Sequence, residues 1–444
     1  MIGSFGQASR RRAVLCSLGI LCIILAGCSQ TFRQIAIPLP TQTGDPAPLN
    51  RALFATTDGI SRPGAVTFVD VPGDTNVGQV QVGNNPVQIG LTFGGGRAIT
   101  PNTGDNTASS FQTGTTTPTV NATSLPASSN PVFAHSRQNG KFYIALSGPT
   151  HNSLGVVDST LALVNEVALG TCSNPVAISQ VPGPGNVYVA CKGSGEVAEV
   201  TSNDNIFLKT ITVGSSPVWI DTSADGKYTF VANQGDSTVS VICSSTDITV
   251  CVGDTVVQTI PVGGAPNFLK YDAHSQRVYV GGAGFISIID TSGIQPAPPA
   301  ATTFTVTNIT TFSGNTWIAA LQDGTRFYVS DSGAKTVTVF NANNLSVIKT
   351  IKLADPLTPI STPANTVPIM IDSDKNSTKV YTANTGSNDM SIIRTSDDTE
   401  VFPGSTAGGG SGRITAPLVG VACTVGTPIG NNCRQTPTYI LVLP

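Results

Sequence analysis

The sequence has few charged residues. Only 11% of its 444 residues are Asp, Glu, Lys or Arg, and its formal net charge is −3. A nucleic-acid-binding surface needs clustered positive charge to neutralise phosphates, so this balance argues against nucleic acid as a partner. The surface must be covered mainly by Ser, Thr, Asn and Gly, and we expect recognition through neutral hydrogen bonds rather than electrostatic steering.

Residues and motifs of catalytic sites are also scarce. The three histidines, His135, His151 and His274, are scattered, and no two occupy equivalent positions along the chain. They therefore predict neither a metal nor a haem site, and we interpret them as solvated loop residues. The sequence contains no Gly-x-Ser-x-Gly elbow, no His-Glu-x-x-His motif and no phosphate-binding Gly-x-x-x-x-Gly-Lys-Ser/Thr loop. We expect no catalytic residues, no metal and no cofactor.

A hydrophobic run of membrane-spanning length is missing, because the apolar run from Ala13 to Ala26 is too short for an ordinary spanning helix. Three arginines precede it, which is the charge order of a secretory signal. The run ends in Leu25-Ala26-Gly27-Cys28, which resembles the lipobox of bacterial lipoproteins. The resemblance implies a signal peptide over residues 1–27 and a diacylglycerol on the thiol of Cys28. The alternatives are a plain cleaved signal and a retained anchor.

The resemblance also predicts where the protein resides. Several acyl chains give durable attachment, and Ser29 in place of aspartate implies, in lipoproteins of the enterobacterial type, passage to the outer membrane. Residues 28–52 contain several prolines and no clear period, as expected of a tether. We expect a monomeric envelope protein that contacts the membrane only through its lipid and faces the periplasm or the cell surface.

Six cysteines remain once residues 1–27 are removed and Cys28 is lipidated. They form three pairs of sequence neighbours: Cys172 with Cys191, Cys243 with Cys251, and Cys423 with Cys433. Six cysteines allow fifteen pairings, but an oxidising compartment and this clustering favour the three neighbouring disulfides. Metal ligation is the competing interpretation, although no pair has the Cys-x-x-Cys spacing.

A unit of about forty to fifty residues recurs along the chain. Two copies have a proline, a glycine nine residues later and an asparagine sixteen residues later, namely Pro86/Gly95/Asn102 and Pro217/Gly226/Asn233. Weaker copies with one or two of these landmarks start at Pro131, Pro175, Pro266, Asn315 and Pro368. Alternating apolar runs and turn residues such as Asp225-Gly226 divide each unit into four short antiparallel strands. Such units cannot bury both faces alone, and radial stacking covers them, so the repeat predicts an all-β fold of the β-propeller type.

The second predicted strand of each unit carries a recurring aromatic motif. It recurs in five of the units, as Phe142-Tyr143-Ile144-Ala145, Val187-Tyr188-Val189-Ala190, Val278-Tyr279-Val280-Gly281, Phe327-Tyr328-Val329-Ser330 and Val380-Tyr381-Thr382-Ala383-Asn384. These segments resemble the YVTN family of β-propeller repeats, and the likeness covers about residues 53–444. The resemblance implies four-stranded antiparallel blades, most often seven in number.

The strand count favours eight blades, with seven as the alternative. The first unit, from residue 53, has no inner strand of its own, whereas Pro437-Thr438-Tyr439-Ile440 near the C-terminus resembles an inner strand without a blade. We expect the C-terminal strand to become the innermost strand of the N-terminal blade and to close the ring. A surface excursion is expected over about residues 394–436, because residues 404–412 are rich in Gly and Ser.

Two sets of residues are candidates for ligand contact. Polar turn residues recur at equivalent places on one face, namely Asn102, Asp105, Asn233, Asp236, Asp331, Asn384 and Asn388. Short polar side chains there cap backbone amides, which is the structural interpretation, and binding of a polar ligand is the alternative. Trp219 and Trp317 share one position in the unit, which indicates a blade core or a channel lining before a stacking site.

The favoured function is that of a non-catalytic binding or scaffold protein that presents its loop face to a protein, peptide or glycan in the envelope. One alternative is a lactonase-like hydrolase resembling 6-phosphogluconolactonase, although loop-face basic residues such as Lys192 and Lys335 are dispersed. A second alternative is a cofactor-binding propeller of the quinoprotein or haem type.

Overall fold

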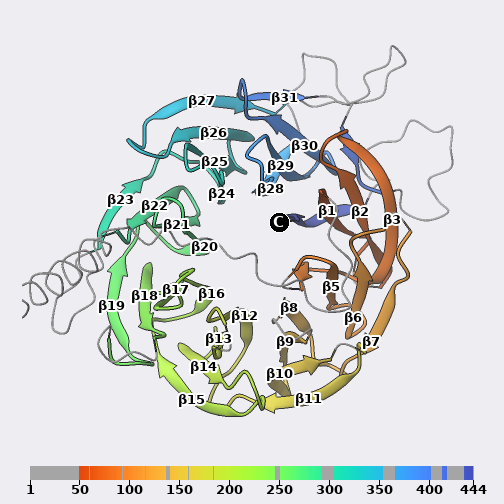
Figure 1. The fold of residues 1–444 in the computed structure, drawn as a ribbon, viewed down its shortest axis with the longest axis vertical. Helices are drawn as coiled ribbons and strands as arrows, with labels where there is room; N and C mark the ends of the chain where they lie inside the picture. The colour runs from red at the N-terminus through yellow and green to blue at the C-terminus, as the bar shows by residue number, and fades with distance from the viewer. Residues whose placement is uncertain are drawn as a thin grey trace, which may run out of the picture. The chain divides into compact units, whose positions relative to one another are not determined.

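The apolar runs of the sequence form short antiparallel strands. The computed structural model describes residues 50–59, 61–92, 94–115, 117–136, 141–158, 160–183, 185–245, 251–292, 304–353, 366–401, 413–417 and 435–443, and this part of the chain contains no helix. The strands form eight antiparallel sheets, seven of four strands and one of five, arranged as the blades of a ring (Figure 1). The β-propeller and its eight blades are therefore confirmed, and the seven-bladed alternative is wrong.

The blades are numbered in chain order, and the strands of each are given from the channel outward. Blades 1 and 2 contain β33 (Thr436–Val442), β1 (Arg51–Thr57), β2 (Pro63–Asp70) and β3 (Thr75–Asn84), then β4 (Gly90–Leu91), β5 (Arg97–Asn102), β6 (Thr107–Gln112) and β7 (Asn121–Ser124). Blades 3 and 4 contain β8 (Pro131–Ser136), β9 (Phe142–Gly148), β10 (His151–Val157) and β11 (Leu163–Ala168), then β12 (Pro175–Gln180), β13 (Val187–Cys191), β14 (Glu196–Val200) and β15 (Phe207–Thr212). Blades 5 and 6 contain β16 (Pro217–Thr222), β17 (Tyr228–Asn233), β18 (Thr238–Cys243) and β19 (Val256–Pro261), then β20 (Pro266–Asp272), β21 (Arg277–Gly282), β22 (Phe285–Asp290) and β23 (Thr305–Ile309). Blades 7 and 8 contain β24 (Thr316–Ala320), β25 (Arg326–Asp331), β26 (Thr336–Asn341) and β27 (Val347–Lys352), then β28 (Val367–Ser373), β29 (Lys379–Thr385), β30 (Asp389–Arg394), β31 (Thr399–Val401) and β32 (Ile414–Thr415).

The C-terminal strand closes the ring, as the sequence predicts. Strand β33 pairs antiparallel with β1, and Ile440 lies opposite Phe54 in this ladder. Both side chains are fully buried. Figure 1 shows the end of the chain at the inner side of blade 1, so one sheet joins the two ends of the described chain.

Blades 2 and 8 depart from the regular pattern. The inner strand of blade 2 is only the two residues of β4, preceded by an isolated bridge between Pro86 and Asn102. In blade 8 the outer strand is divided, because β31 and β32 both pair with β30. Part of the expected excursion over 394–436 therefore belongs to this blade, and the buried Arg413, 3.2 Å from Asp389, fixes the returning segment.

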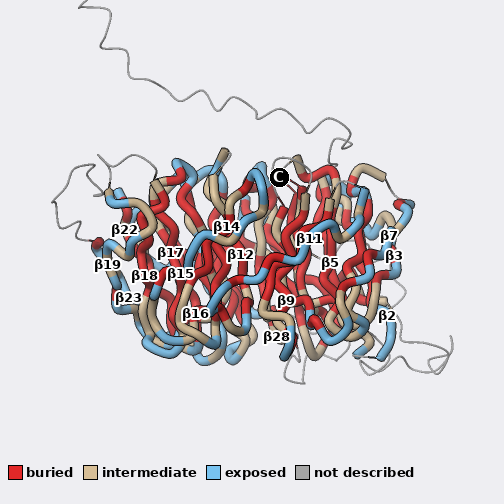
Figure 2. Tube along the Cα trace, turned by 90° about the horizontal axis from the view of Figure 1, so that it is seen from below, coloured by how far each residue is buried: buried red, intermediate tan, exposed pale blue. Residues whose placement is uncertain are grey.

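The apolar core lies between neighbouring blades. One cluster combines Phe230 of blade 5 with Leu269 and Val280 of blade 6, and the other interfaces have similar clusters. Figure 2 shows buried residues along the middle of the strands and exposed residues at both faces of the ring. Each blade therefore buries its apolar side chains against its neighbours, as expected for a propeller.

No membrane-crossing helix is found among the described residues.

A disulfide between Cys243 and Cys251 confirms one predicted pair. It joins the end of β18 to the segment before β19, on the face opposite the unit-starting prolines. Cys423, Cys433 and Cys28 lie outside the described residues.

Ring closure by β33 predicts a large penalty for truncating its buried side chain. Ile440→Ala should lower the free energy of unfolding by about 3 kcal/mol, because a buried methyl-rich side chain is replaced by a cavity. The matched control is Ile348→Ala on the outer strand β27, where the side chain is 47% exposed and the expected loss is under about 0.5 kcal/mol. Denaturant unfolding measures both, and equal losses would show that β33 is not an integral strand of blade 1.

Candidate functional site

The inner strands bring one short segment from every blade to the central channel (Figure 1). Except in blade 7, where Asn315 precedes β24, each inner strand begins at or within a few residues of a proline, which lacks an N–H and therefore suits the first position of a strand. In blade 5, Pro217 lies opposite Asn233 but Trp219 lies opposite Ala232, so the residue after the proline is bulged out of the ladder. The same shift occurs in blades 3, 4, 6 and 8. The second and fourth residues after the proline then share one side of each strand.

The second positions form an aromatic layer across the channel. They hold Gln88, Phe133, Ala177, Trp219, Phe268, Trp317, Met370 and Tyr439. The ring centroid of Trp219 lies 5.6 Å from that of Phe133 and 5.3 Å from that of Trp317, both edge to face. Trp317 also stacks on Phe268 at 4.1 Å. Rings from blades 3, 5, 6 and 7 therefore meet near the axis, which confirms the channel-lining interpretation of the two tryptophans.

The fourth positions form a polar layer beside the aromatic one. They hold Gly90, His135, Ser179, Asp221, Lys270, Ala319, Asp372 and Leu441. A cavity of about 200 Å³ extends between the two layers, and its lining includes His135, Asp221, Lys270 and Asp372 together with the aromatic residues. Strand geometry separates the layers by about 7 Å. The cavity thus has one apolar and one charged end.

Asp221 and Asp372 occupy equivalent positions in blades 5 and 8 and connect each blade to the next. The backbone N–H of Tyr271 donates to Oδ2 of Asp221 at 2.9 Å, and the backbone N–H of Val442 donates to Oδ2 of Asp372 at 2.8 Å. Each carboxylate accepts a second hydrogen bond from the N–H of the residue that follows it. Burial raises the pKa of Asp221 to about 6, because these N–H groups and Lys270 offset only part of the lost hydration.

Lys270 reaches across blade 7 to blade 8. Its Nζ lies 3.7 Å from Oδ1 of Asp372, and its side chain is 46% exposed. Its positive charge also favours the ionised form of Asp221. The pair is therefore solvent-accessible on the side of Lys270 and more shielded at Asp372, which is 14% exposed.

His135 lies in strand β8 and lines the cavity, so the interpretation of this residue as a solvated loop histidine is wrong. Burial lowers its pKa to about 4, which keeps the imidazole neutral at physiological pH. The ring forms no hydrogen bond with the described residues. It is therefore free to donate one hydrogen bond and accept another. Among the described residues, no three His, Cys, Asp or Glu side chains are arranged to hold a metal ion.

The predicted loop-face residues lie on the face where the prolines begin the inner strands, and internal contacts use most of their polar groups. Asn102, Asn233 and Asn384 are fully buried and donate to side chains of the following strand. Asp105, Asp236 and Asp331 accept hydrogen bonds from the backbone N–H groups of Asn84, Ser215 and Ser313. Asn388 is buried in the left-handed conformation. These contacts cap the loops, and a binding role for the set stays a prediction.

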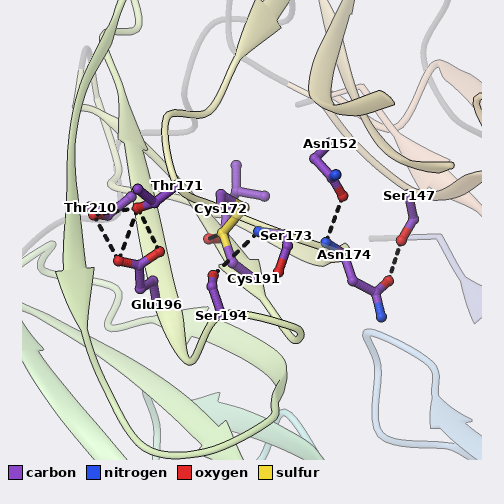
Figure 3. Close-up of a disulfide and its surroundings, with 11 residues drawn as sticks. Ser147, Asn152, Thr171, Cys172, Ser173, Asn174, Cys191, Ser194, Glu196 and Thr210 are labelled. Atoms are coloured by element: carbon purple, nitrogen blue, oxygen red, sulfur yellow. Dashed lines mark hydrogen bonds between the residues drawn. A yellow bond between two sulfur atoms is a disulfide. The ribbon is translucent and has the colours of Figure 1, made fainter. Parts of the chain in front are cut away.

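The disulfide between Cys172 and Cys191 lies on the same face and confirms a second predicted pair (Figure 3). Beside it, the backbone N–H of Ser173 donates to the hydroxyl of Ser194 at 3.3 Å. The backbone N–H of Asn174 donates to Oδ1 of Asn152 in blade 3 at 2.7 Å. The disulfide thus fixes the loop that leads into β12.

The polar layer was not identified from the sequence. Its members differ in residue type from blade to blade, so no motif repeats. A usable signal exists in two blades, where a carboxylate follows the unit-starting proline by four residues at Asp221 and Asp372. Charge inside an otherwise apolar inner strand marks a residue that either pairs across blades or contacts a ligand.

Asp221 predicts a specific pH dependence of stability. Its pKa in the fold lies above its ordinary value, so it contributes stability while protonated, and this contribution is lost as the pH rises through 6. Lowering the pH from 7.5 to 4.5 should therefore stabilise the wild-type protein by about 2 kcal/mol relative to Asp221→Asn. Denaturant unfolding across this range measures the difference.

The control is Asp225→Asn. Although burial raises the pKa of Asp225, hydrogen bonds from Ser223 and Lys227 lower it below its ordinary value overall. The stability that the Asp225 carboxylate contributes should therefore be lost as the pH falls, which is opposite to the trend expected for Asp221. A constant difference between Asp221→Asn and the wild type would contradict the burial of this carboxylate.

Comparisons with known proteins support the architecture. No protein-family model and no curated protein sequence matches the chain. Among solved structures, the chain is similar to dihydro-heme d1 dehydrogenase NirN in complex with DHE, at 14% identity over 91% of this chain and 78% of that chain, with a TM-score of 0.62. It is also similar to apo AztD from Citrobacter koseri, at 12% identity over 79% and 93% of the two chains (TM-score 0.57). A third similar structure is hydrazine synthase from Kuenenia stuttgartiensis, at 16% identity over 70% and 96% (TM-score 0.52). At these identities the likeness shows the β-propeller fold alone.

Proposed function

We propose that this chain is a non-catalytic binding protein of the cell envelope, attached to the outer membrane by a lipid on Cys28, and that part of a protein, peptide or glycan partner enters its central channel. The observation that supports this role is the cavity in which side chains from most of the blades converge. A concave site with an apolar wall and a few polar groups is the usual form of a ligand site.

The channel is a better recognition element than the loop face. On the loop face, the recurrent Asn and Asp side chains hold backbone and side-chain groups of the protein itself. In the channel, the ring of His135 has no partner among the described residues, and Lys270 is partly exposed to solvent. Groups with unused hydrogen-bonding capacity are the ones that can bind a ligand.

The charges of the cavity are unfavourable for the lactonase alternative. A phosphosugar needs clustered Arg or Lys side chains. Among the described residues that line the cavity, Lys270 is the one Lys or Arg side chain, and Asp221 and Asp372 line the same cavity. The cofactor-binding alternative stays a prediction, and an absorption spectrum of protein purified from its own host tests it.

The lipid anchor predicts the behaviour of a single variant. Cys28→Ser should move the protein from the membrane pellet to the soluble fraction after cell lysis, because the acylated thiol is lost. Cys22→Ser is the matched control within the signal peptide and should leave the protein in the pellet. Immunoblotting of the two fractions measures the distribution, and retention of Cys28→Ser in the pellet would contradict lipid anchoring at this residue.

Binding in the channel can be followed by tryptophan fluorescence. The chain contains two tryptophans, Trp219 and Trp317, and both line the cavity. We expect at least one short peptide or oligosaccharide from a panel of defined compounds to change the emission saturably. His135→Ala should weaken this binding about tenfold through a lost hydrogen bond, whereas Asp236→Ala on the loop face should not. The reverse pattern would place recognition on the loop face, and no emission change with any compound would contradict the channel site.

A further inference from the structure

We propose that the channel cavity binds an ammonium group, and that Lys270 occupies the position of this group in the unliganded protein as a displaceable internal competitor. This inference rests on the proposed binding function and names the chemistry that the channel selects.

The two carboxylates of the polar layer provide the first argument. Asp221 and Asp372 each accept two backbone hydrogen bonds, which leaves lone pairs on both carboxylates for a further donor. Among the described residues, no basic side chain forms a salt bridge with Asp221. A shielded carboxylate without a paired cation is costly, so an ammonium ligand that contacts it would be strongly favoured.

The aromatic layer provides the second argument. The faces and edges of Trp219, Phe268 and Trp317 border the cavity about two residues along the strands from the carboxylates. Aromatic rings attract cations and also cover alkyl groups, and tryptophan does so most strongly. A cavity of about 200 Å³ accommodates an ammonium group with a short alkyl chain. The two layers match the two ends of such a ligand.

The balance of charge around the cavity favours a cation. Five strands contribute titratable groups to the lining: His135 on β8, Asp221 on β16, Lys270 on β20, Asp372 on β28 and Tyr439 on β33. By formal charge, the lining holds two carboxylates, Asp221 and Asp372, and one ammonium group, Lys270. His135 and Tyr439 add no charge at neutral pH, since burial lowers the pKa of the former to about 4 and raises that of the latter. The excess negative charge favours a cationic ligand over a phosphate or carboxylate.

The side chain of Lys270 lies at the border of two cavities. Its side chain also borders a neighbouring cavity of about 190 Å³, which is lined by Tyr271, Asp272 and His274. The carboxylate of Asp272 in that cavity accepts hydrogen bonds from Ser275 and offers a counter-charge to the lysine. An ammonium ligand that enters the channel can therefore replace Lys270 at Asp372 while Lys270 turns toward Asp272.

The test uses n-butylammonium chloride as the probe and the emission of the two tryptophans as the readout, with sodium chloride at equal ionic strength as the reference. Lys270→Met should tighten binding about tenfold, because the competitor is removed. Asp221→Asn and Asp372→Asn should each weaken it at least tenfold. Lys227→Met removes a surface lysine of similar exposure, 3.3 Å from Asp225, and should leave the affinity unchanged.

Two further arms complete the test. The affinity of the wild-type protein should fall about tenfold between pH 7 and pH 5, since Asp221 must be ionised, and this fall should be absent in Asp221→Asn.

A peptide with one internal lysine and blocked ends carries the same ammonium group as n-butylammonium. Tighter binding of this peptide than of n-butylammonium identifies a lysine side chain as the source, and equal or weaker binding identifies a free amine.

The affinity of Lys270→Met for n-butylammonium is the decisive result. Weaker or unchanged binding of n-butylammonium by this variant would overturn the inference. If other compounds of the panel still changed the emission of the wild-type protein, the proposed binding function would stand without it. Thermal unfolding checks that each variant is folded, and Lys270→Gln serves as the second variant if the methionine variant is not.

Discussion

The pairing of β33 with β1 is the contact on which the rest of the ring depends. A propeller has no layer to cover an open end, so its first and last blades must meet or leave bare sheet edges. Here the same pairing also builds the channel. It places Tyr439 in the aromatic layer and Leu441 in the polar layer, and it brings the N–H of Val442 to Asp372. The strand pairing that closes the ring therefore also completes the candidate site.

The blades are held to one another by a repeated polar contact at the outer side of the core. The hydroxyl of Tyr143 in blade 3 donates to Asn205 in blade 4 at 2.6 Å, and that of Tyr188 in blade 4 donates to Asp254 in blade 5 at 2.8 Å. Both acceptors have the left-handed backbone conformation, at φ values of 57°. The hydroxyl of Tyr328 in blade 7 likewise donates to Asp398 in blade 8, so the tyrosine of the second strand finds an acceptor from the next blade in blades 3, 4 and 7. Where blade 5 has Phe230 instead, the contact is with Phe304.

Much of the fold could be predicted from the sequence because its signals are local. The proline and asparagine landmarks lie opposite each other in one hairpin in blades 2, 5 and 8, as Pro217 and Asn233 do, and so make these blades recognisable in the sequence. The disulfide pairs followed from neighbouring positions in the chain for the same reason. The polar layer could not be predicted, because it takes single residues from separate blades and their convergence depends on the closed ring. His135 illustrates the difference, because its sequence neighbours do not show that it lines the same cavity as Asp221 and Lys270.

Hydrogen exchange of the paired strands tests ring closure most directly. If β33 is an integral strand of blade 1, the amides of Leu53 and Leu441, which lie opposite each other as a hydrogen-bonded pair, should exchange only through the opening that releases the inner strands of the other blades. Equal opening free energies for β1, β33 and the inner strands of blades 4 and 5 are the predicted result. Rapid exchange in β33 while those strands remain protected would contradict the account, because the ring would then stand without its C-terminal strand.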